Sequence, residues 1–206
     1  AEIEANMATI AAQGYTAIQT SPVQVMKEDT VDSSVGTHWW VYYQPVDFKI
    51  NDENGNALGT KSELESMIAT AHEYGVKVIV DVVANHLGNK TGNDLADKIP
   101  EYLRKDEYWH DIKTNISSWD SRENMTQYCL DGLPDLNTSN KEVQNYVLAF
   151  LKECIDAGAD GFRFDAAKHI EVPEDSYCGS DFWPTVINGI KSYKSDVYVY
   201  GEMLDD

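Results

Sequence analysis

The sequence predicts an α/β fold in which helices connect parallel strands, and two observations support this. The first is that helical and short apolar segments alternate along the 206 residues, an order typical of parallel strands. A doubly wound sheet and a (β/α)8 barrel both satisfy that alternation. The second favours the barrel, because barrels build sites from polar residues at the C-terminal ends of several strands. Such residues end or follow the predicted strands: Asp81, Asn85, His86, Arg163, Asp165 and Glu202.

The first 23 residues predict one helix and one strand. Residues 1–13 place apolar side chains at helical spacing, at Ile3, Met7, Ile10 and Ala11. Gly14 ends this helix, and residues 15–23 form an apolar run that ends near Pro22. Because the helix is already under way at the first residue, we expect the chain to be part of a longer protein.

A second helix and strand are predicted after a polar loop. Thr60 and Glu63 have the spacing of a capping box and begin a helix over residues 60–74, which Gly75 ends. Residues 76–85 are almost continuously apolar. This pattern is typical of a strand that is covered on both faces.

Residues 87–139 interrupt the alternation with polar residues, scattered aromatic residues and little periodicity. A segment of this length without regular structure is usually a functional excursion or an inserted domain. The chain is therefore divided into a regular part at 1–86, a functional excursion or inserted domain at 87–139 and a second regular part at 140–206, and the two regular parts belong to the barrel if the fold is one.

The alternation then resumes. Ser139 and Glu142 have the spacing of another capping box. The helix that follows places apolar residues on one face, namely Val143, Val147, Phe150, Leu151, Cys154 and Ile155. Further elements are predicted as a strand at 161–167, a helix at 183–194 and a strand at 197–203.

The composition excludes several classes of function. With 16 basic and 35 acidic residues the net charge is −19, which argues against binding to nucleic acid or to an anionic membrane. No apolar run is long enough to cross a membrane. The three cysteines show no C-x-x-C spacing and allow at most one disulfide. No G-x-G-x-x-G, Walker or G-x-S-x-G motif is present.

Asp165 and Glu202 end neighbouring predicted strands and form a candidate carboxylate pair. Glycoside hydrolysis uses two such groups, one to attack the anomeric carbon and one to protonate the leaving oxygen. Carboxylates at strand ends also cap helices, so either residue alone is equally compatible with a structural role. Arg163, Lys168 and His169 add charge to the same segment, where unpaired buried charges would be costly.

Several ordered motifs together resemble the α-amylase family of glycoside hydrolases. They are DVVANHLGN (81–89), LPDLN (133–137), GFRFDAAKH (161–169) and GEML (201–204), with the aromatic loop WWVYYQPVDFKI (39–50) upstream. The resemblance implies part of a TIM (β/α)8 barrel, from its first helix to its fifth strand, with an irregular inserted domain after the third strand. It also implies retaining endo-hydrolysis of α-1,4-glucosidic bonds in starch, glycogen and maltooligosaccharides.

The resemblance assigns roles to the motif residues. Asp165 matches the catalytic nucleophile and Glu202 the general acid/base. Arg163 would keep the nucleophile ionised, although an ordinary ion pair is compatible with the same spacing. The positions that match substrate contacts or their supports are Trp39, Trp40, Tyr43, Gln44, Asp81, His86, Lys168 and His169.

The resemblance also implies a structural calcium ion that joins the inserted domain to the barrel. Its expected ligands are Asn85, Asp135 and the backbone carbonyl of His169, with another carbonyl from about residues 124–128. Oxygen ligands from separate segments suit this hard cation. No organic cofactor is implied, and the enzyme is expected to be extracellular and monomeric.

One departure from the family pattern concerns activity. The family's third carboxylate, which lies on a later strand, has no counterpart in these residues, so we expect the 206 residues alone to lack turnover. Two alternatives remain open. One is an α-1,6-acting or transglycosylating member of the family, and the other is a non-catalytic relative that binds α-glucans.

Overall fold

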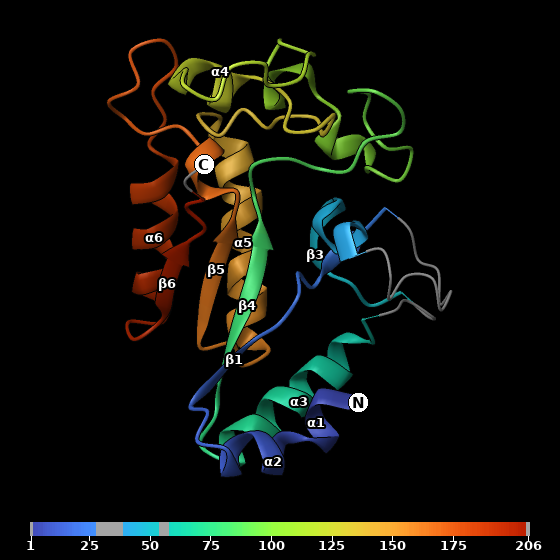
Figure 1. Cartoon of the computed structure of the whole chain (residues 1–206), viewed down its shortest axis with the longest axis vertical. Helices are drawn as coiled ribbons and strands as arrows, with labels where there is room; N and C mark the ends of the chain where they lie inside the picture. The colour runs from blue at the N-terminus through green and yellow to red at the C-terminus, as the bar shows by residue number, and fades with distance from the viewer. Residues whose placement is uncertain (1, 28–38, 54–57, 205–206) are drawn as a thin grey trace.

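A parallel sheet of four strands forms the centre of the chain (Figure 1). The computed structural model describes residues 2–27, 39–53 and 58–204. Neighbouring strands follow chain order without reversal, which is how strands succeed one another around a barrel, whereas a doubly wound sheet reverses direction. The strands are β1 (Ala17–Gln19), β4 (Lys77–Val83), β5 (Gly161–Asp165) and β6 (Tyr198–Gly201).

Helices connect these parallel strands as the alternation predicted. Of the first predicted helix, the structure keeps two short pieces that separate at Asn6. Their apolar side chains pack with α3 and β4, where Met7, Met67, Ile68 and Val78 are buried together. The helices are α1 (Glu2–Ala5), α2 (Met7–Ala12), α3 (Lys61–Glu73), α5 (Lys141–Asp156) and α6 (Phe182–Tyr193).

One predicted capping box is confirmed and the other is wrong. The Thr60 hydroxyl accepts from the backbone N–H of Glu63, whose side chain accepts from the backbone of Thr60. At the start of α5 the N-cap is Asn140, which accepts from the backbone N–H of Glu142 at 2.9 Å. Asparagine is among the preferred N-cap residues, and the Ser139 hydroxyl bonds to Asn137 instead.

A small antiparallel sheet occupies part of the predicted polar loop. It pairs β2 (Gln24–Met26) with β3 (Pro45–Ile50), and the 3-10 helix η2 (Trp39–Tyr43) precedes β3. The buried Gln24 amide joins this sheet to the main one, because it donates to the carbonyl of Val83 at 3.0 Å and accepts from its N–H at 2.9 Å. The aromatic loop is thereby fixed beside the end of β4.

Residues 87–139 lie above the C-terminal ends of β4 and β5 (Figure 1). They contain the short elements η3 (Glu101–Leu103), η4 (Asp106–Tyr108) and α4 (Arg122–Gln127) among irregular backbone. A backbone bridge between His86 and Asp135 closes the two ends of the segment onto each other. The segment therefore leaves and re-enters the fold at the edge where the predicted site residues lie.

The core is continuous between the sheet and the helices that cover it. Phe162 and Phe164 of β5 are fully buried, and Phe164 packs edge-on against Phe182 and Trp183 of α6. Gly161 begins β5 where a Cβ atom would lie 2.5 Å from the carbonyl oxygen of Tyr198. Only glycine allows β6 to approach this closely. Among the described residues, no helix is both long and apolar enough to cross a membrane.

Candidate active site

The register of the parallel sheet gathers the charged residues at one edge. Asp81 of β4 lies directly beside Arg163 of β5. Asp165 lies two residues further along the same strand, so both side chains lie on one face of the sheet. Glu202 follows β6, and its backbone N–H donates to the carbonyl of Phe164 at 2.8 Å. Four charged groups from three strands thus converge.

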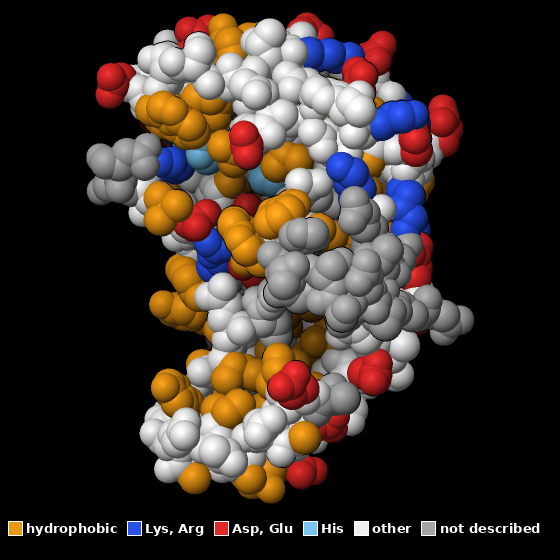
Figure 2. Space-filling model, turned by 45° about the vertical axis from the view of Figure 1, so that its right-hand side comes forward, with side chains coloured by type: hydrophobic (Ala, Val, Ile, Leu, Met, Phe, Trp, Pro, Cys, Tyr) orange, Lys and Arg blue, Asp and Glu red, His pale blue; other side chains and the backbone are white. Residues whose placement is uncertain are grey.

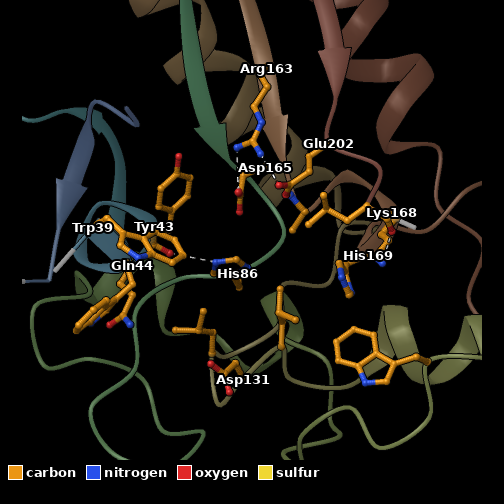
Figure 3. Close-up of a pocket in the computed structure, with 16 residues that line it drawn as sticks. Trp39, Tyr43, Gln44, His86, Asp131, Arg163, Asp165, Lys168, His169 and Glu202 are labelled. Carbon is orange, nitrogen blue, oxygen red and sulfur yellow. Dashed lines mark hydrogen bonds and ion pairs between the residues drawn. The ribbon is translucent and has the colours of Figure 1, made fainter. Parts of the chain in front are cut away.

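The Arg163 guanidinium contacts all three carboxylates, and Figure 3 shows it beside Asp165 and Glu202. Nη1 lies 2.8 and 2.7 Å from the two Asp81 oxygens and 3.0 Å from Asp165 Oδ1. Nη2 lies 2.6 Å from Glu202 Oε1. Because Asp165 and Glu202 share one small planar cation, the two carboxyl groups predicted to be catalytic are held next to each other.

Burial and charge act in opposite directions on this cluster. Burial raises the pKa of Asp165 to about 7 against the effect of the Arg163 cation, while Glu202 and Asp81 raise it further. Burial likewise raises the pKa of Asp81, and Arg163 opposes that rise. The guanidinium is therefore the group that favours the ionised form of Asp165, which is the form needed for nucleophilic attack.

Asp81 lies beneath the cleft and is completely buried. Its Oδ2 atom accepts from the Tyr43 hydroxyl at 2.9 Å and from Gln19 Nε2 at 3.3 Å. Asp81 therefore acts on the cleft through Tyr43 and Arg163, which both line it. This is a supporting position below the residues that a ligand could touch.

Aromatic residues of η2 form one wall of the cleft. Trp39 and Trp40 are 66% and 44% exposed. The Trp39 ring lies 5.8 Å from that of Tyr43 in an edge-to-face arrangement. Gln44 follows and accepts from Lys27 Nζ at 3.4 Å. These rings can present flat apolar surfaces to a ligand. The bond from the Tyr43 hydroxyl to Asp81 and the packing of Trp39 against Tyr43 help to hold them in place.

The opposite wall comes from the segment after β5 and from the insertion. Lys168 Nζ donates to the carbonyl of Leu204 at 2.6 Å and lies 5.8 Å from the centre of the Trp119 ring. The His169 ring lies edge-on to Trp119, with 6.0 Å between ring centres. Trp119 is 49% exposed. Sequence reasoning did not identify it, because an aromatic residue in an irregular segment has no periodicity that assigns its direction.

His86 lies between the two walls, on the floor of the cleft (Figure 3). Its Nε2 atom is 3.1 Å from the carbonyl oxygen of Tyr43. Burial lowers the pKa of His86 to about 4, so the imidazole is neutral near pH 7. A neutral ring can exchange hydrogen bonds with an uncharged hydroxyl.

The two walls enclose a cleft with a volume of about 750 Å³. Figure 2 shows a hollow on this face where hydrophobic, acidic, basic and histidine side chains gather. An open cleft with aromatic walls and carboxylates on its floor suits a long polar ligand with apolar faces. Ten of the site residues predicted from the sequence line this cleft: Trp39, Trp40, Tyr43, Gln44, His86, Arg163, Asp165, Lys168, His169 and Glu202.

Two of the predicted calcium ligands are in contact. Asn85 Nδ2 lies 3.0 Å from Asp135 Oδ1, and both side chains are buried. Burial raises the pKa of Asp135 to about 7, so a cation beside this carboxylate would stabilise its ionised form. His169 lies nearby in the cleft wall, where its Nδ1 atom is 2.9 Å from the carbonyl oxygen of Met125. The amide oxygen of Asn85, the carboxylate of Asp135 and the backbone carbonyl of His169 are the types of oxygen ligand that calcium takes.

Arg122 of α4 joins the insertion to the segment after β5. Its guanidinium donates to the backbone carbonyls of Lys168 and Ile170, and it forms an ion pair with Asp175 at 3.1 Å. These two carbonyls flank His169. Arg122 therefore helps to set the backbone that carries one wall of the cleft, and sequence reasoning did not identify this role.

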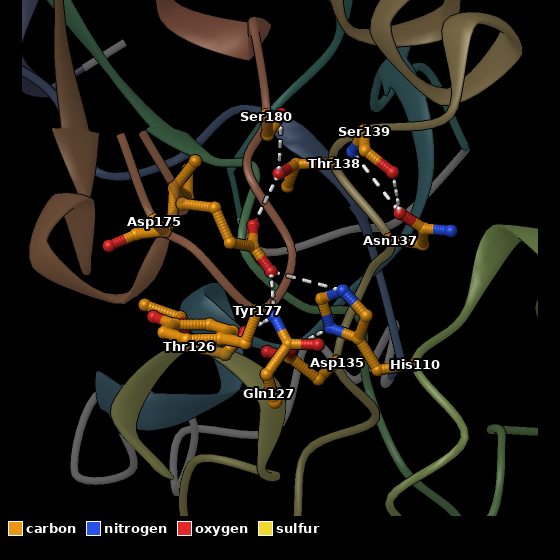
Figure 4. A network of polar contacts seen from close by, with 12 residues as sticks. His110, Thr126, Gln127, Asp135, Asn137, Thr138, Ser139, Asp175, Tyr177 and Ser180 are labelled. Carbon is orange, nitrogen blue, oxygen red and sulfur yellow. Dashed lines mark hydrogen bonds and ion pairs between the residues drawn. The ribbon is translucent and has the colours of Figure 1, made fainter. Parts of the chain in front are cut away.

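His110 of the insertion lies between the buried carboxylates of Asp135 and Glu171, and Figure 4 shows His110 next to Asp135. Its Nδ1 atom is 2.6 Å from Asp135 Oδ2, and its Nε2 atom is 3.0 Å from Glu171 Oε1. Burial alone would lower the pKa of His110, but Asp135 and Glu171 raise it to about 10. Neither His110 nor Glu171 was identified from the sequence, because they are 61 positions apart and belong to no common motif.

Comparison with protein families identifies the chain. Residues 6–206 match the family profile "Alpha amylase, catalytic domain". The chain belongs to the α-amylase family. It is 39% identical over 211 residues to an α-amylase of Clostridium acetobutylicum, and this match covers 99% of the chain and 26% of that relative. It is 36% identical over 219 residues to an α-amylase of Butyrivibrio fibrisolvens, and this match covers 97% of the chain and 22% of that relative. The chain thus spans about a quarter of the length of these relatives.

Solved structures of α-amylases and a related enzyme have the same fold. An Anoxybacillus α-amylase superposes with a TM-score of 0.77 and 26% identity, covering 98% of this chain and 39% of that one. A cyclomaltodextrin glucanotransferase superposes with a TM-score of 0.78 and 25% identity, covering 98% of this chain and 41% of that one. The α-amylase from Geobacillus thermoleovorans, complexed with acarbose, superposes with a TM-score of 0.75 and 25% identity, covering 98% of this chain and 40% of that one. The predicted partial barrel is therefore confirmed.

We predict that Asp81→Asn destabilises this α-amylase domain strongly. The substitution keeps the shape of the side chain but leaves Arg163 with one fewer buried negative partner, and breaking such a pair costs about 3 kcal/mol. Chemical denaturation, followed by tryptophan fluorescence, measures the free energy of unfolding. Asp97→Asn is the control, because its ion pair with Lys90 is exposed and should contribute nothing measurable. Equal stability of the two variants would contradict the prediction.

Proposed function

We propose that the protein is a retaining α-amylase that hydrolyses internal α-1,4-glucosidic bonds in starch, glycogen and related α-glucans. The observation that carries this proposal is the contact of one guanidinium, that of Arg163, with both Asp165 and Glu202 on the floor of an aromatic cleft. Retaining glycosidases need two carboxyl groups about 5 to 5.5 Å apart. We expect that separation here, because both groups contact the same cation.

In the proposed first step, an oxygen of the Asp165 carboxylate attacks the anomeric carbon. The bond from that carbon to the leaving oxygen breaks as Glu202 donates a proton to the oxygen, which leaves a glycosyl group on Asp165. In the second step, Glu202 takes a proton from water, and the hydroxide oxygen attacks the same carbon. Asp165 departs as a carboxylate, so both residues return to their starting states.

The backbone after the nucleophile supports the acid/base residue. Ala166 has a φ angle of +49°, an uncommon conformation for a residue with a side chain. In that conformation its N–H donates to Glu202 Oε2 at 3.0 Å. Backbone strain of this kind tends to occur at functional sites. Here it supports a fixed position for the Glu202 carboxyl opposite Asp165.

The walls of the cleft support recognition of a glucan chain. Pyranose rings have apolar faces, which suit the exposed ring of Trp39 and the half-buried ring of Tyr43 on one side and the exposed ring of Trp119 on the other. The neutral His86 between them can bond to a sugar hydroxyl. The Geobacillus relative is described in complex with acarbose, which supports oligosaccharide binding in this cleft. Because starch is too large to cross a membrane, we place the enzyme outside the cell.

A second candidate function is transfer of a glucan chain to another sugar. The structural match to a cyclomaltodextrin glucanotransferase favours it. Hydrolysis and transfer share the first chemical step and differ in whether water or a sugar hydroxyl attacks the glycosyl group on Asp165. The product profile on amylose, including any cyclic products, distinguishes the two functions.

A calcium ion bound by Asn85, Asp135 and the carbonyl of His169 is also proposed. Its positive charge would attract ligands from both parts of the protein, and the ion would thereby join the insertion to the barrel. The chain's own residues already cluster there, since Asn85 contacts Asp135 and Arg122 holds the backbone on both sides of His169. The ion would therefore act on the stability of the cleft wall and take no part in the chemical steps.

We predict that Asp165→Asn and Glu202→Gln abolish turnover for different reasons, as measured in a protein that also supplies the family's third carboxylate. Asp165→Asn removes the nucleophile, so a fluorinated glycosyl inhibitor should leave no covalent adduct in a mass spectrum. Glu202→Gln removes the proton donor, so a substrate with an activated leaving group should still form the adduct. An adduct on the Asp165→Asn protein, or inverted stereochemistry of the product by NMR, would contradict the assignment.

We predict that Trp119→Ala weakens substrate binding with little effect on the chemical step. Loss of one stacking surface should raise KM for a maltooligosaccharide about 3- to 10-fold while kcat changes little. Steady-state kinetics of a protein that contains these residues and also supplies the third carboxylate measures both constants. Trp119→Phe is the matched control, because it keeps an aromatic face. A fall in kcat without a change in KM would place Trp119 outside the binding surface.

We predict that calcium removal lowers the thermal midpoint of the protein. A ligand that binds only the native state adds stability in proportion to the logarithm of its concentration over its Kd. Differential scanning calorimetry with EGTA, followed by addition of calcium or magnesium, tests this. Calcium should restore the midpoint and magnesium should not. Identical midpoints before and after chelation, with no calcium detected in the untreated protein, would refute the site.

A further inference from the structure

A second group of metal-ligating side chains lies outside the cleft. The ligand atoms of His110, Glu171 and Cys178 all lie within 4.8 Å of one another. His110 belongs to the insertion, whereas Glu171 and Cys178 belong to the loop between η5 (Ala167–His169) and α6. None of these three residues has a role in the proposed reaction, and all lie outside the motifs that the sequence resemblance used.

The His110 ring is oriented as a metal ligand would be. Its side chain is 6% exposed, and Asp135 lies 2.6 Å from Nδ1. Nε2 is buried and makes no hydrogen bond of acceptable geometry, although Glu171 Oε1 is 3.0 Å away. A histidine that binds a metal through one nitrogen usually donates the other to a carboxylate or carbonyl. His110 has this carboxylate support at Nδ1, and its Nε2 atom faces Glu171 in an ion pair, so zinc binding there would release the Nε2 proton.

Glu171 is held in place by groups that leave it beside His110. Its side chain is 1% exposed. The Thr138 hydroxyl and the Gln127 amide each donate to one of its two oxygens. Supporting bonds of this type orient carboxylate ligands in metal sites. The carboxylate is therefore preorganised and fully desolvated.

Cys178 supplies the third ligand atom. It is a free cysteine and is partly exposed, unlike the buried Cys129 and Cys154. A thiolate is a soft ligand that prefers zinc over calcium. The combination of a thiolate, an imidazole and a carboxylate therefore differs in kind from the oxygen ligands expected around Asn85.

We propose that His110 Nε2, a carboxylate oxygen of Glu171 and Cys178 Sγ bind a zinc ion. Zinc takes four ligands, and water would complete the set. Tetrahedral zinc with bonds of about 2.0 to 2.3 Å separates its ligand atoms by about 3.3 to 3.8 Å. The three ligand atoms lie within 4.8 Å of one another, and His110 Nε2 is 3.0 Å from Glu171 Oε1, so shifts of about 1 Å or less bring the separations into that range.

The zinc ion would connect the insertion to the loop that follows the nucleophile strand. Its charge would also balance Glu171 and, through His110, Asp135. Asp135 takes part in both metal sites in different ways, because Oδ1 faces Asn85 and Oδ2 supports His110. Zinc and calcium should therefore stabilise the same junction from neighbouring positions. The zinc site does not depend on the proposed hydrolysis.

The test uses the whole protein without a histidine tag. After removal of metal with a nitrogen-donor chelator, titration with Zn²⁺ in the presence of calcium should bind about one zinc per chain by mass spectrometry of the metal. Cys178→Ser and Glu171→Gln should each weaken zinc binding at least about 10-fold. Cys154→Ala is the matched control, because this cysteine lies in the core far along α5. Its zinc binding should be unchanged.

Two further measurements test the zinc site even if a variant folds poorly. Co²⁺ in place of zinc should give a thiolate charge-transfer band in the near ultraviolet, present in Cys154→Ala and absent in Cys178→Ser. In the unmodified protein, zinc should protect Cys178 from alkylation, and chelation should expose it, as mapped by peptide mass spectrometry. Absence of zinc binding in the presence of calcium, or a cobalt band that survives Cys178→Ser, would overturn the proposal.

Discussion

The site depends on one buried cation, the guanidinium of Arg163, that is shared by three carboxylates. Without it, Asp81 and Asp165 would lie buried as neighbouring negative charges, and each would be driven to bind a proton. With it, one carboxylate can remain below the floor as a support while Asp165 and Glu202 face the cleft. The Tyr43 hydroxyl extends the same network to the aromatic wall through Asp81. The floor and one wall are therefore a single electrostatic unit.

The second wall is attached by a different set of polar contacts. Arg122 binds the backbone on both sides of His169, and His110 lies between Asp135 of the insertion and Glu171 of the loop after β5. Few apolar contacts are needed at such a junction, because charge-assisted hydrogen bonds fix direction as well as distance. The proposed calcium and zinc ions would strengthen this junction.

Most regular elements were predictable because their signals are local. Apolar periodicity located β4, α5 and β5, and the Thr60 cap marked the start of α3. The antiparallel pair β2 and β3 was missed, since its short strands are held by the Gln24 amide on the backbone of Val83. Ser139 was wrongly predicted as a cap because capping depends on which of two adjacent polar side chains faces the helix. Trp119 and His110 lie in irregular backbone, where no periodicity indicates direction, and Arg122 begins the short helix α4, whose six residues carry no clear apolar pattern.

The sequence by itself determined the strand–helix alternation, the family motifs and the pairing of Asp165 with Glu202 as candidates, because each depends on residue type and spacing along the chain. Polar strand ends and the family motifs favoured a barrel over a doubly wound sheet, but the strand order itself came only from the tertiary structure, since it is a property of long-range pairing. It also placed Asp81 beneath the cleft and joined His110 to Glu171 across 61 positions. Such contacts arise from packing and desolvation, which bring together residues that no local pattern connects.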